Sequence, residues 1–138
     1  MQDILDKALE LHASPLFQGL DADALVSLAE LAHGRALRAG EQLFAAGQET
    51  NEAYLVVRGK VRLEGDGGAV EEAGPGDCIG ELPALTGRPR VMTATAIDDV
   101  RVLEIPPDVL LDTLTDHPDV VRAFAAGLSA RVRAAGKR

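Results

Sequence analysis

The chain has 138 residues, of which 46% are hydrophobic, as expected for one soluble domain with its own core. Its formal net charge of −8, from 22 acidic and 14 basic residues, argues against general binding to nucleic acid or anionic membranes, because both require a positive surface. The single cysteine, Cys78, excludes an intramolecular disulfide and a cysteine-based zinc cluster.

Two helices are predicted within residues 1–34. Apolar residues recur at helical spacing over residues 3–13, and Ser14-Pro15 ends that helix because proline disfavours a helical residue before it. Asp21 is a suitable N-cap for the second helix, with Leu20 and Leu25 as a hydrophobic staple. We expect Leu25, Leu28 and Leu31 to form its buried face and Gly34 to end it.

Residues 35–105 have the character of a β-rich block. Short runs of strand-forming residues alternate with glycine turns, and Gly65-Asp66-Gly67-Gly68 is a strong hairpin signal. No helix separates the runs, which disfavours a parallel α/β sheet and favours a small barrel or sandwich. Strands are expected at residues 41–44, 52–58, 60–64, 70–73, 93–97 and 100–105.

Two further helices are predicted within residues 106–138. The first begins at Pro106-Pro107-Asp108 and presents Leu110, Leu111 and Leu114. The second, over residues 119–135, carries one large apolar stripe and one stripe of small residues. The small stripe favours either a dimer seam or simply a strong helix, since alanine is the best helix former. The apolar stripe consists of Val121, Phe124, Leu128 and Val132, and the small one of Ala123, Gly127, Ala130 and Ala134.

Residues 74–96 have the parts of an anion cradle. Glycines at positions 74, 76 and 80 allow tight turns and close backbone approach to a ligand, and a short helical turn can begin after Gly80. Arg90 follows Glu81 after nine residues and can grip a phosphate through two parallel N–H bonds. An acidic side chain beside it can accept a hydrogen bond from a sugar hydroxyl. This combination suits a sugar phosphate.

The chain resembles the cyclic nucleotide-binding domain family from about Pro15 to Arg133. The resemblance rests on ordered blocks, the most specific of which is Gly76-Asp77 followed by Ile79-Gly80-Glu81-Leu82 and Pro89-Arg90. It implies a mainly β (α+β) fold, an eight-stranded antiparallel β-roll with N-terminal helices and two C-terminal helices, in a single domain over residues 1–138. The phosphate-binding cassette would occupy about residues 76–93. The other blocks are Phe17-Gln18-Gly19-Leu20, Gly40-Glu41-Gln42-Leu43-Phe44 with Gly47, and Tyr54 to Val61.

The resemblance also implies roles for the cassette residues. Arg90 would bind the cyclic phosphate and Glu81 the ribose 2′-hydroxyl, with Gly80 and Leu82 at the start of the cassette helix. Val91 stands where a hydroxyl helps some members bind cyclic GMP, so cyclic AMP is favoured over cyclic GMP. The alternative from the residues alone is that Arg90 caps its own loop and that Glu81 pairs only with Arg90.

Three residues depart from the family's pattern. Pro83 stands where an alanine usually offers its N–H to the phosphate, and proline has no N–H. Met92 is bulkier than the usual small residue and would fill part of the pocket. Val91 also replaces the usual Ser, Thr or Ala.

The first functional hypothesis is a cyclic nucleotide sensor that relays binding through its C-terminal helix to a partner, a second copy or an attached domain. The second is a packing module of the same fold without useful ligand affinity, and the third is a DNA-binding regulator, which the acidity disfavours. No nucleophile accompanies Glu81 and Arg90, so we expect no catalysis and no cofactor. No run reaches the ~20 apolar residues of a membrane-spanning helix. The start lacks a signal-peptide pattern, so a cytoplasmic protein is expected.

Overall fold

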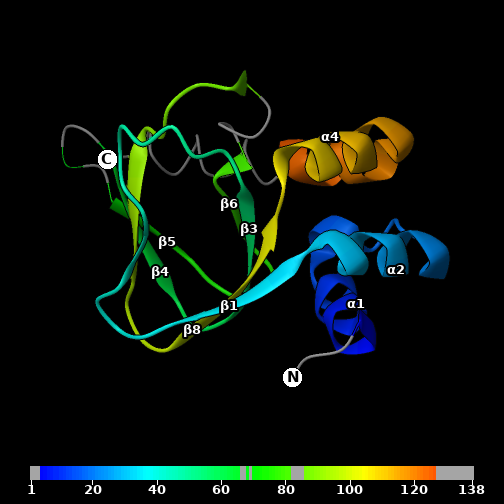
Figure 1. The fold of residues 1–138 in the computed structure, drawn as a ribbon, viewed down its shortest axis with the longest axis horizontal. Helices are drawn as coiled ribbons and strands as arrows, with labels where there is room; N and C mark the ends of the chain where they lie inside the picture. The colour runs from blue at the N-terminus through cyan, green and yellow to red at the C-terminus, as the bar shows by residue number, and fades with distance from the viewer. Residues whose placement is uncertain (1–3, 66–67, 69, 82–85, 127–138) are drawn as a thin grey trace.

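The structure, a computed structural model, describes residues 4–65, 68, 70–81 and 86–126. Figure 1 shows the helices gathered beside a roll of strands. The prediction of a mainly β protein with an eight-stranded β-roll and flanking helices is confirmed. The elements are α1 (Ile4–Ala13), the short 3-10 helix η1 (Pro15–Phe17), α2 (Ala22–Leu31), β1 (His33–Leu37), β2 (Gln42–Phe44), β3 (Ala53–Arg58), β4 (Val61–Gly65), β5 (Val70–Ala73), β6 (Cys78–Ile79), β7 (Met92–Ala96), β8 (Val100–Ile105) and α4 (Pro107–Asp116); residues 118–126 are also helical.

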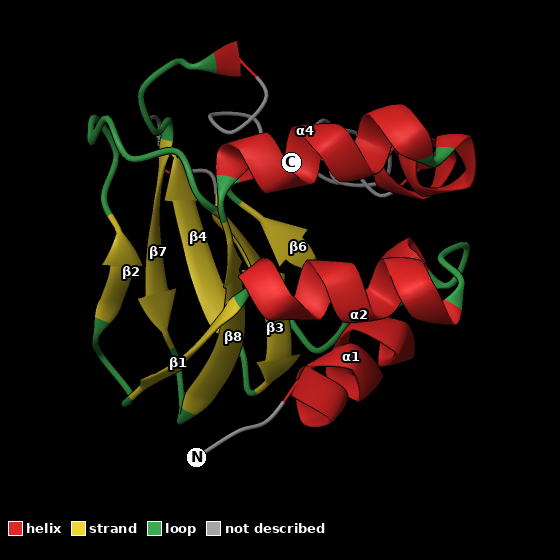
Figure 2. Ribbon diagram, turned by 45° about the vertical axis from the view of Figure 1, so that its right-hand side comes forward, coloured by secondary structure: helices red, strands yellow, loops and turns green. Residues whose placement is uncertain are grey.

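The strands form two four-stranded sheets in which every paired neighbour is antiparallel. The first has the order β1-β8-β3-β6 and the second the order β2-β7-β4-β5. The helices lie on one side of this roll in both views, with α2 between α1 and α4 (Figures 1 and 2). The molecule is therefore layered as helices, first sheet, second sheet.

The central strands of the first sheet are buried on both faces. Successive strand residues point to opposite faces, and in β3 Ala53 and Leu55 pack with the helices while Tyr54 and Val56 pack with the second sheet. Burial on both faces explains why β3 is a continuous apolar run rather than an alternating one. By contrast, β4 alternates between buried Val61 and exposed Arg62 because its outer face meets solvent.

The start of α2 is confirmed, but its end is not where the sequence indicated. The Ala24 N–H donates to the Asp21 side chain at 2.8 Å, and Leu20 and Leu25 are both buried. The helix ends at Leu31, and Gly34 lies inside β1 instead of ending α2. β1 could not be predicted from the sequence, because its residues His33 to Ala36 are all exposed and lack an apolar run.

The apolar helix faces were predicted correctly except at their edges. Leu25, Leu28 and Ala29 are the buried residues of α2, whereas Leu31 is 51% exposed because 100° per residue rotates it off that face. Leu110 is fully buried in α4, while its neighbour Leu111 is 52% exposed. Of the stripes expected in the last helix, Phe124 packs against the core, whereas Val121 is 44% exposed. The members of both stripes from Gly127 onward lie outside the described residues.

Candidate functional site

The cassette begins in a tight turn between β5 and β6. The Asp77 N–H donates to the Gly74 carbonyl at 3.0 Å, and the Asp77 carboxylate accepts from the Gly74 N–H at 2.9 Å. Gly76 has a φ of +93°, which favours glycine, and its carbonyl accepts a 2.7 Å hydrogen bond from buried Ser14. The turn is therefore fixed to the N-terminal helices.

After β6 the chain turns again at Gly80, which has a φ of +74°. A Cβ here would overlap Arg90 Nη1 and would lie 3.2 Å from the Glu52 carbonyl oxygen, so only glycine fits. Glu81 follows directly, is 6% exposed, and is helical, as is Thr86. Leu82 and Pro83 lie outside the described residues.

Arg90 is a buried cation whose hydrogen-bond acceptors are uncharged groups. Its side chain is 3% exposed, and it donates from Nε to the Thr50 hydroxyl (3.2 Å), from Nη1 to the Gly80 carbonyl (3.1 Å) and from Nη2 to the Glu52 carbonyl (2.8 Å). A guanidinium has five N–H groups, so one N–H on each terminal nitrogen has no acceptor among the described residues. Two such N–H groups match two oxygens of one phosphate.

The loop between β2 and β3 holds Arg90 in place, a role that was not predicted from the sequence. The Gly47 N–H donates to the Arg90 carbonyl at 2.7 Å, and the Arg90 N–H donates to the Gln48 carbonyl at 2.8 Å. Thr50 and Glu52 then supply the side-chain and carbonyl acceptors described above. The available signal was the polar run Glu49 to Glu52 directly before a buried strand.

Two aromatic rings lie against the guanidinium. Arg90 Cζ is 4.2 Å from the centroid of the Phe44 ring and 5.7 Å from that of Tyr54. Burial lowers the pKa of Arg90, whereas the charges of Tyr54 and Glu52 raise it. The site is therefore built around a positive charge in a poorly hydrated place, where an anion is attracted more strongly than at the surface.

Tyr54 offers an independent test of this environment, because it is the only tyrosine in the chain. Burial first, and then the neighbouring Glu104 and Glu52 carboxylates, raise its pKa to about 12. We expect the alkaline absorbance change of tyrosinate to occur near pH 12 in the folded protein. In the unfolded chain the pKa of Tyr54 is near 10. The raised pKa of the folded state therefore contributes stability that is present below pH 10 and is lost as the pH rises toward 12. A transition near pH 10 in folded protein would show that Tyr54 is solvated.

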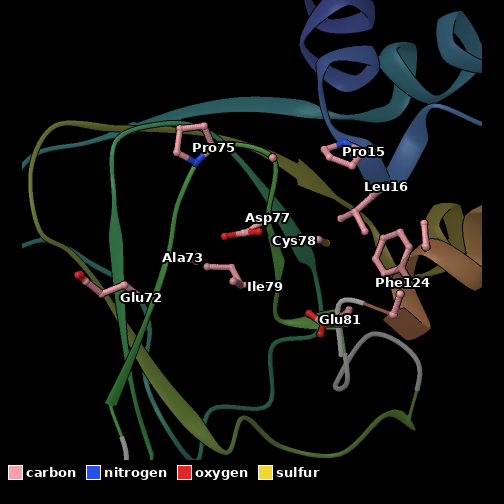
Figure 3. A pocket seen from close by; sticks show the side chains of 13 residues that line it. Pro15, Leu16, Glu72, Ala73, Pro75, Asp77, Cys78, Ile79, Glu81 and Phe124 are labelled. Carbon is pink, nitrogen blue, oxygen red and sulfur yellow. The ribbon is translucent and has the colours of Figure 1, made fainter. Parts of the chain in front are cut away.

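A pocket of about 550 Å³ lies beside the cassette (Figure 3). Glu81 lines it at the end of the strand that carries Cys78 and Ile79, with Leu16 and Phe124 on one side and Glu72 and Ala73 on the other. The remaining lining residues are Pro15, Pro75, Gly76, Asp77, Ala123 and Ala126. The lining therefore joins the β-roll to η1 and the C-terminal helix.

The structure brings some of the predicted site residues together and separates others. Gly80 and Arg90 are hydrogen-bonded, and Glu81 is the next residue along the chain. Arg90 itself does not line the pocket, and the side chain of Val91 is 63% exposed. Met92 packs against the core between the sheets and does not line the pocket either.

The part of the chain that the structure describes holds neither a metal-binding group nor a membrane-spanning helix. Within it, no three His, Cys, Asp or Glu side chains gather as a metal-binding group. No described helix has the length and apolar character needed to cross a membrane.

The chain is similar to several proteins of known kind. It is 28% identical over 128 residues to a CRP-like cAMP-activated global transcriptional regulator of Mycobacterium tuberculosis, covering 89% of this chain and 57% of the regulator. It is 29% identical over 112 residues to a Pycsar effector protein of Xanthomonas perforans, covering 80% of this chain and 36% of the effector. The chain thus spans little more than half the length of the first relative and about a third of the second.

Solved structures agree with these similarities. The Thermus thermophilus Catabolite Activator Protein superposes with a TM-score of 0.72 at 31% identity, covering 89% of this chain and 60% of that protein. The regulatory subunit of a cAMP-independent protein kinase A from Trypanosoma brucei superposes with a TM-score of 0.76 at 23% identity, covering 89% of this chain and 48% of that protein. At this identity the likeness shows the fold alone. The cyclic nucleotide-binding domain profile matches residues 34–117, more than half of the chain. The chain therefore belongs to the cyclic nucleotide-binding domain family.

Proposed function

We propose that this chain is a non-catalytic sensing domain that binds a cyclic nucleotide, with cyclic AMP preferred to cyclic GMP. The observation that carries the proposal is Arg90: it is 3% exposed, its three acceptors are neutral, and one N–H on each terminal nitrogen has no acceptor in the described part of the chain. Burying a cation without a compensating charge is costly, so an anionic ligand would be strongly favoured there.

We also propose roles for the residues that neighbour Arg90 in the cassette. Glu81 lines the pocket and is proposed to accept a hydrogen bond from the ribose 2′-hydroxyl. Gly80 and Leu82 are proposed to flank it at the start of the cassette helix. Val91 brings no hydroxyl to the site, which supports cyclic AMP over cyclic GMP. The name of the Mycobacterium tuberculosis relative, a cAMP-activated regulator, agrees with this preference.

Ligand binding is proposed to be relayed through the C-terminal helix to a partner, a second copy or an attached domain. Phe124 and Ala123 of that helix line the same pocket as Glu81. Phe124 also packs edge-to-face on Phe17 at a centroid distance of 5.7 Å, which links the helix to η1. A ligand that contacts the pocket therefore changes the surroundings of this helix directly. The domain is proposed to act in the cytoplasm, without contacting nucleic acid itself.

A second candidate function is a packing module without ligand affinity. It is favoured by the engagement of three Arg90 donors by the protein's own Thr50, Gly80 and Glu52. In this alternative, Arg90 serves only to hold the cassette and the loop between β2 and β3 together.

Thermal unfolding with a panel of small molecules distinguishes the two candidates. Cyclic AMP at about 100 times its Kd is expected to stabilise a sensor by about 2.7 kcal/mol, which raises Tm by on the order of 10 °C. Cyclic GMP is expected to give a smaller shift, and adenosine and inorganic phosphate almost none, because each lacks part of the ligand. An unchanged Tm at millimolar cyclic AMP and cyclic GMP would favour the packing module.

A further inference from the structure

Arg90 rests on an aromatic stack that joins the two sheets. Phe44 ends β2 in the second sheet, and Tyr54 belongs to β3 in the first. Their rings stack with centroids 5.9 Å apart and planes 27° apart, and the guanidinium carbon lies 4.2 Å from the centroid of Phe44. The Tyr54 hydroxyl donates to Glu104 at 3.2 Å. All three stacked groups are at most 5% exposed.

The stack and the hydrogen bonds restrain Arg90 in different directions. The bonds to Thr50, Gly80 and Glu52 hold the N–H groups of the guanidinium, whereas the Phe44 ring lies against its central carbon, Cζ. A buried aromatic ring attracts a cation through its quadrupole, and the attraction strengthens where water is excluded. Bidentate binding of a phosphate requires a fixed plane, because both N–H groups must point at two oxygens at once.

We infer that Phe44, supported by Tyr54, is a positioning residue that orients the Arg90 guanidinium before any anion arrives. This inference rests on the proposed function of Arg90 as the phosphate ligand. Phe44 acts through Arg90 and contacts no ligand itself. An aliphatic residue of similar volume fills the same space but offers no π face to the cation. Phe44→Leu therefore separates the positioning role from simple filling of the core.

The experiment compares Phe44→Leu with the unaltered chain in two measurements. In calorimetric titration with cyclic AMP, the substitution is expected to raise Kd roughly 5- to 30-fold. In the ligand-free protein, the Arg90 Nε–H resonance, assigned by its loss in Arg90→Met, is expected to be protected and shifted by the ring. In Phe44→Leu it is expected to lose that shift and to exchange faster with water.

Leu63→Val is the matched control, and Phe44→Met is a second variant of the same position. Leu63→Val removes a methylene from the core that contains Phe44, so it lowers stability while Phe44, Tyr54 and Arg90 are all retained. It is expected to leave the Arg90 resonance unchanged and the cyclic AMP Kd within about twofold. If Phe44→Leu does not fold, Phe44→Met takes its place with the same expectations.

The experiment distinguishes a failure of the proposed cyclic nucleotide binding from a failure of the proposed role of Phe44. If the unaltered chain binds no cyclic AMP, the proposed function fails, and the resonance alone decides whether Phe44 positions Arg90. An Arg90 resonance that stays protected and shifted in Phe44→Leu would overturn the inference. So would an unchanged cyclic AMP Kd in that variant, or an equal loss of affinity in Leu63→Val.

Discussion

Gly80→Ala is expected to destabilise the domain by about 2–4 kcal/mol and to weaken cyclic AMP binding at least roughly tenfold. A φ of +74° disfavours any side chain, which alone accounts for about 1–2 kcal/mol. The added methyl group also overlaps Arg90 Nη1 and crowds the Glu52 carbonyl oxygen, so Arg90 has to move. Urea unfolding and titration with cyclic AMP measure the two effects.

Gly87→Ala is the matched control for this prediction. Gly87 has nearly the same backbone conformation, with a φ of +71°, but no atom lies within 4 Å of where its Cβ would be. It is expected to cost only the backbone strain of about 1–2 kcal/mol and to leave cyclic AMP binding intact. Equal effects of the two substitutions would mean that the contact between Gly80 and Arg90 does not matter.

Arg90→Met is expected to weaken cyclic AMP binding by at least roughly 100-fold. Two charge-assisted hydrogen bonds to the phosphate would be lost, and each contributes about 1.5–3 kcal/mol. Methionine retains an unbranched apolar stem that can fill the space against Phe44. The carbonyls of Gly80 and Glu52 and the Thr50 hydroxyl lose their donor, so stability is expected to fall by about 1–3 kcal/mol.

Arg88→Met removes the same charge two residues away. Arg88 is exposed, and its substitution is expected to change stability by less than about 0.5 kcal/mol and binding by less than about threefold. Competition against a fluorescent cyclic AMP derivative compares both variants with the unaltered chain. Similar affinities for Arg88→Met and Arg90→Met would show that only the net charge of the loop matters.

The sequence predicted the fold well because local signals and global packing agree. The glycine turns separate short apolar runs, and the Asp21 carboxylate caps the start of α2 by accepting a hydrogen bond from the Ala24 N–H. The misses occur where burial depends on the tertiary structure. β1 carries no apolar run because it lies exposed at a sheet edge, and Gly34 continues into that strand instead of ending α2. Leu31 and Leu111 extend apolar faces that the neighbouring layer does not cover.

The sequence indicated only those residues of the candidate site that lie close to one another along the chain. Gly80, Glu81 and Arg90 stand out because glycine, carboxylate and arginine occur in one loop. Phe44, Thr50 and Glu52 reach Arg90 from 38 to 46 positions earlier in the chain, and pairing of β2 with β7 brings them there. No local pattern in the sequence records such a contact. The aromatic stack and the carbonyl acceptors of Arg90 therefore required the structure.

Calorimetric titration of the unaltered chain with cyclic AMP tests the central proposal most directly. Saturable binding with one site per chain, abolished in Arg90→Met and retained in Arg88→Met, is the result expected of a domain built around Arg90. No heat at millimolar cyclic AMP, together with no effect of Arg90→Met other than lost stability, would contradict it and leave Arg90 as a structural residue.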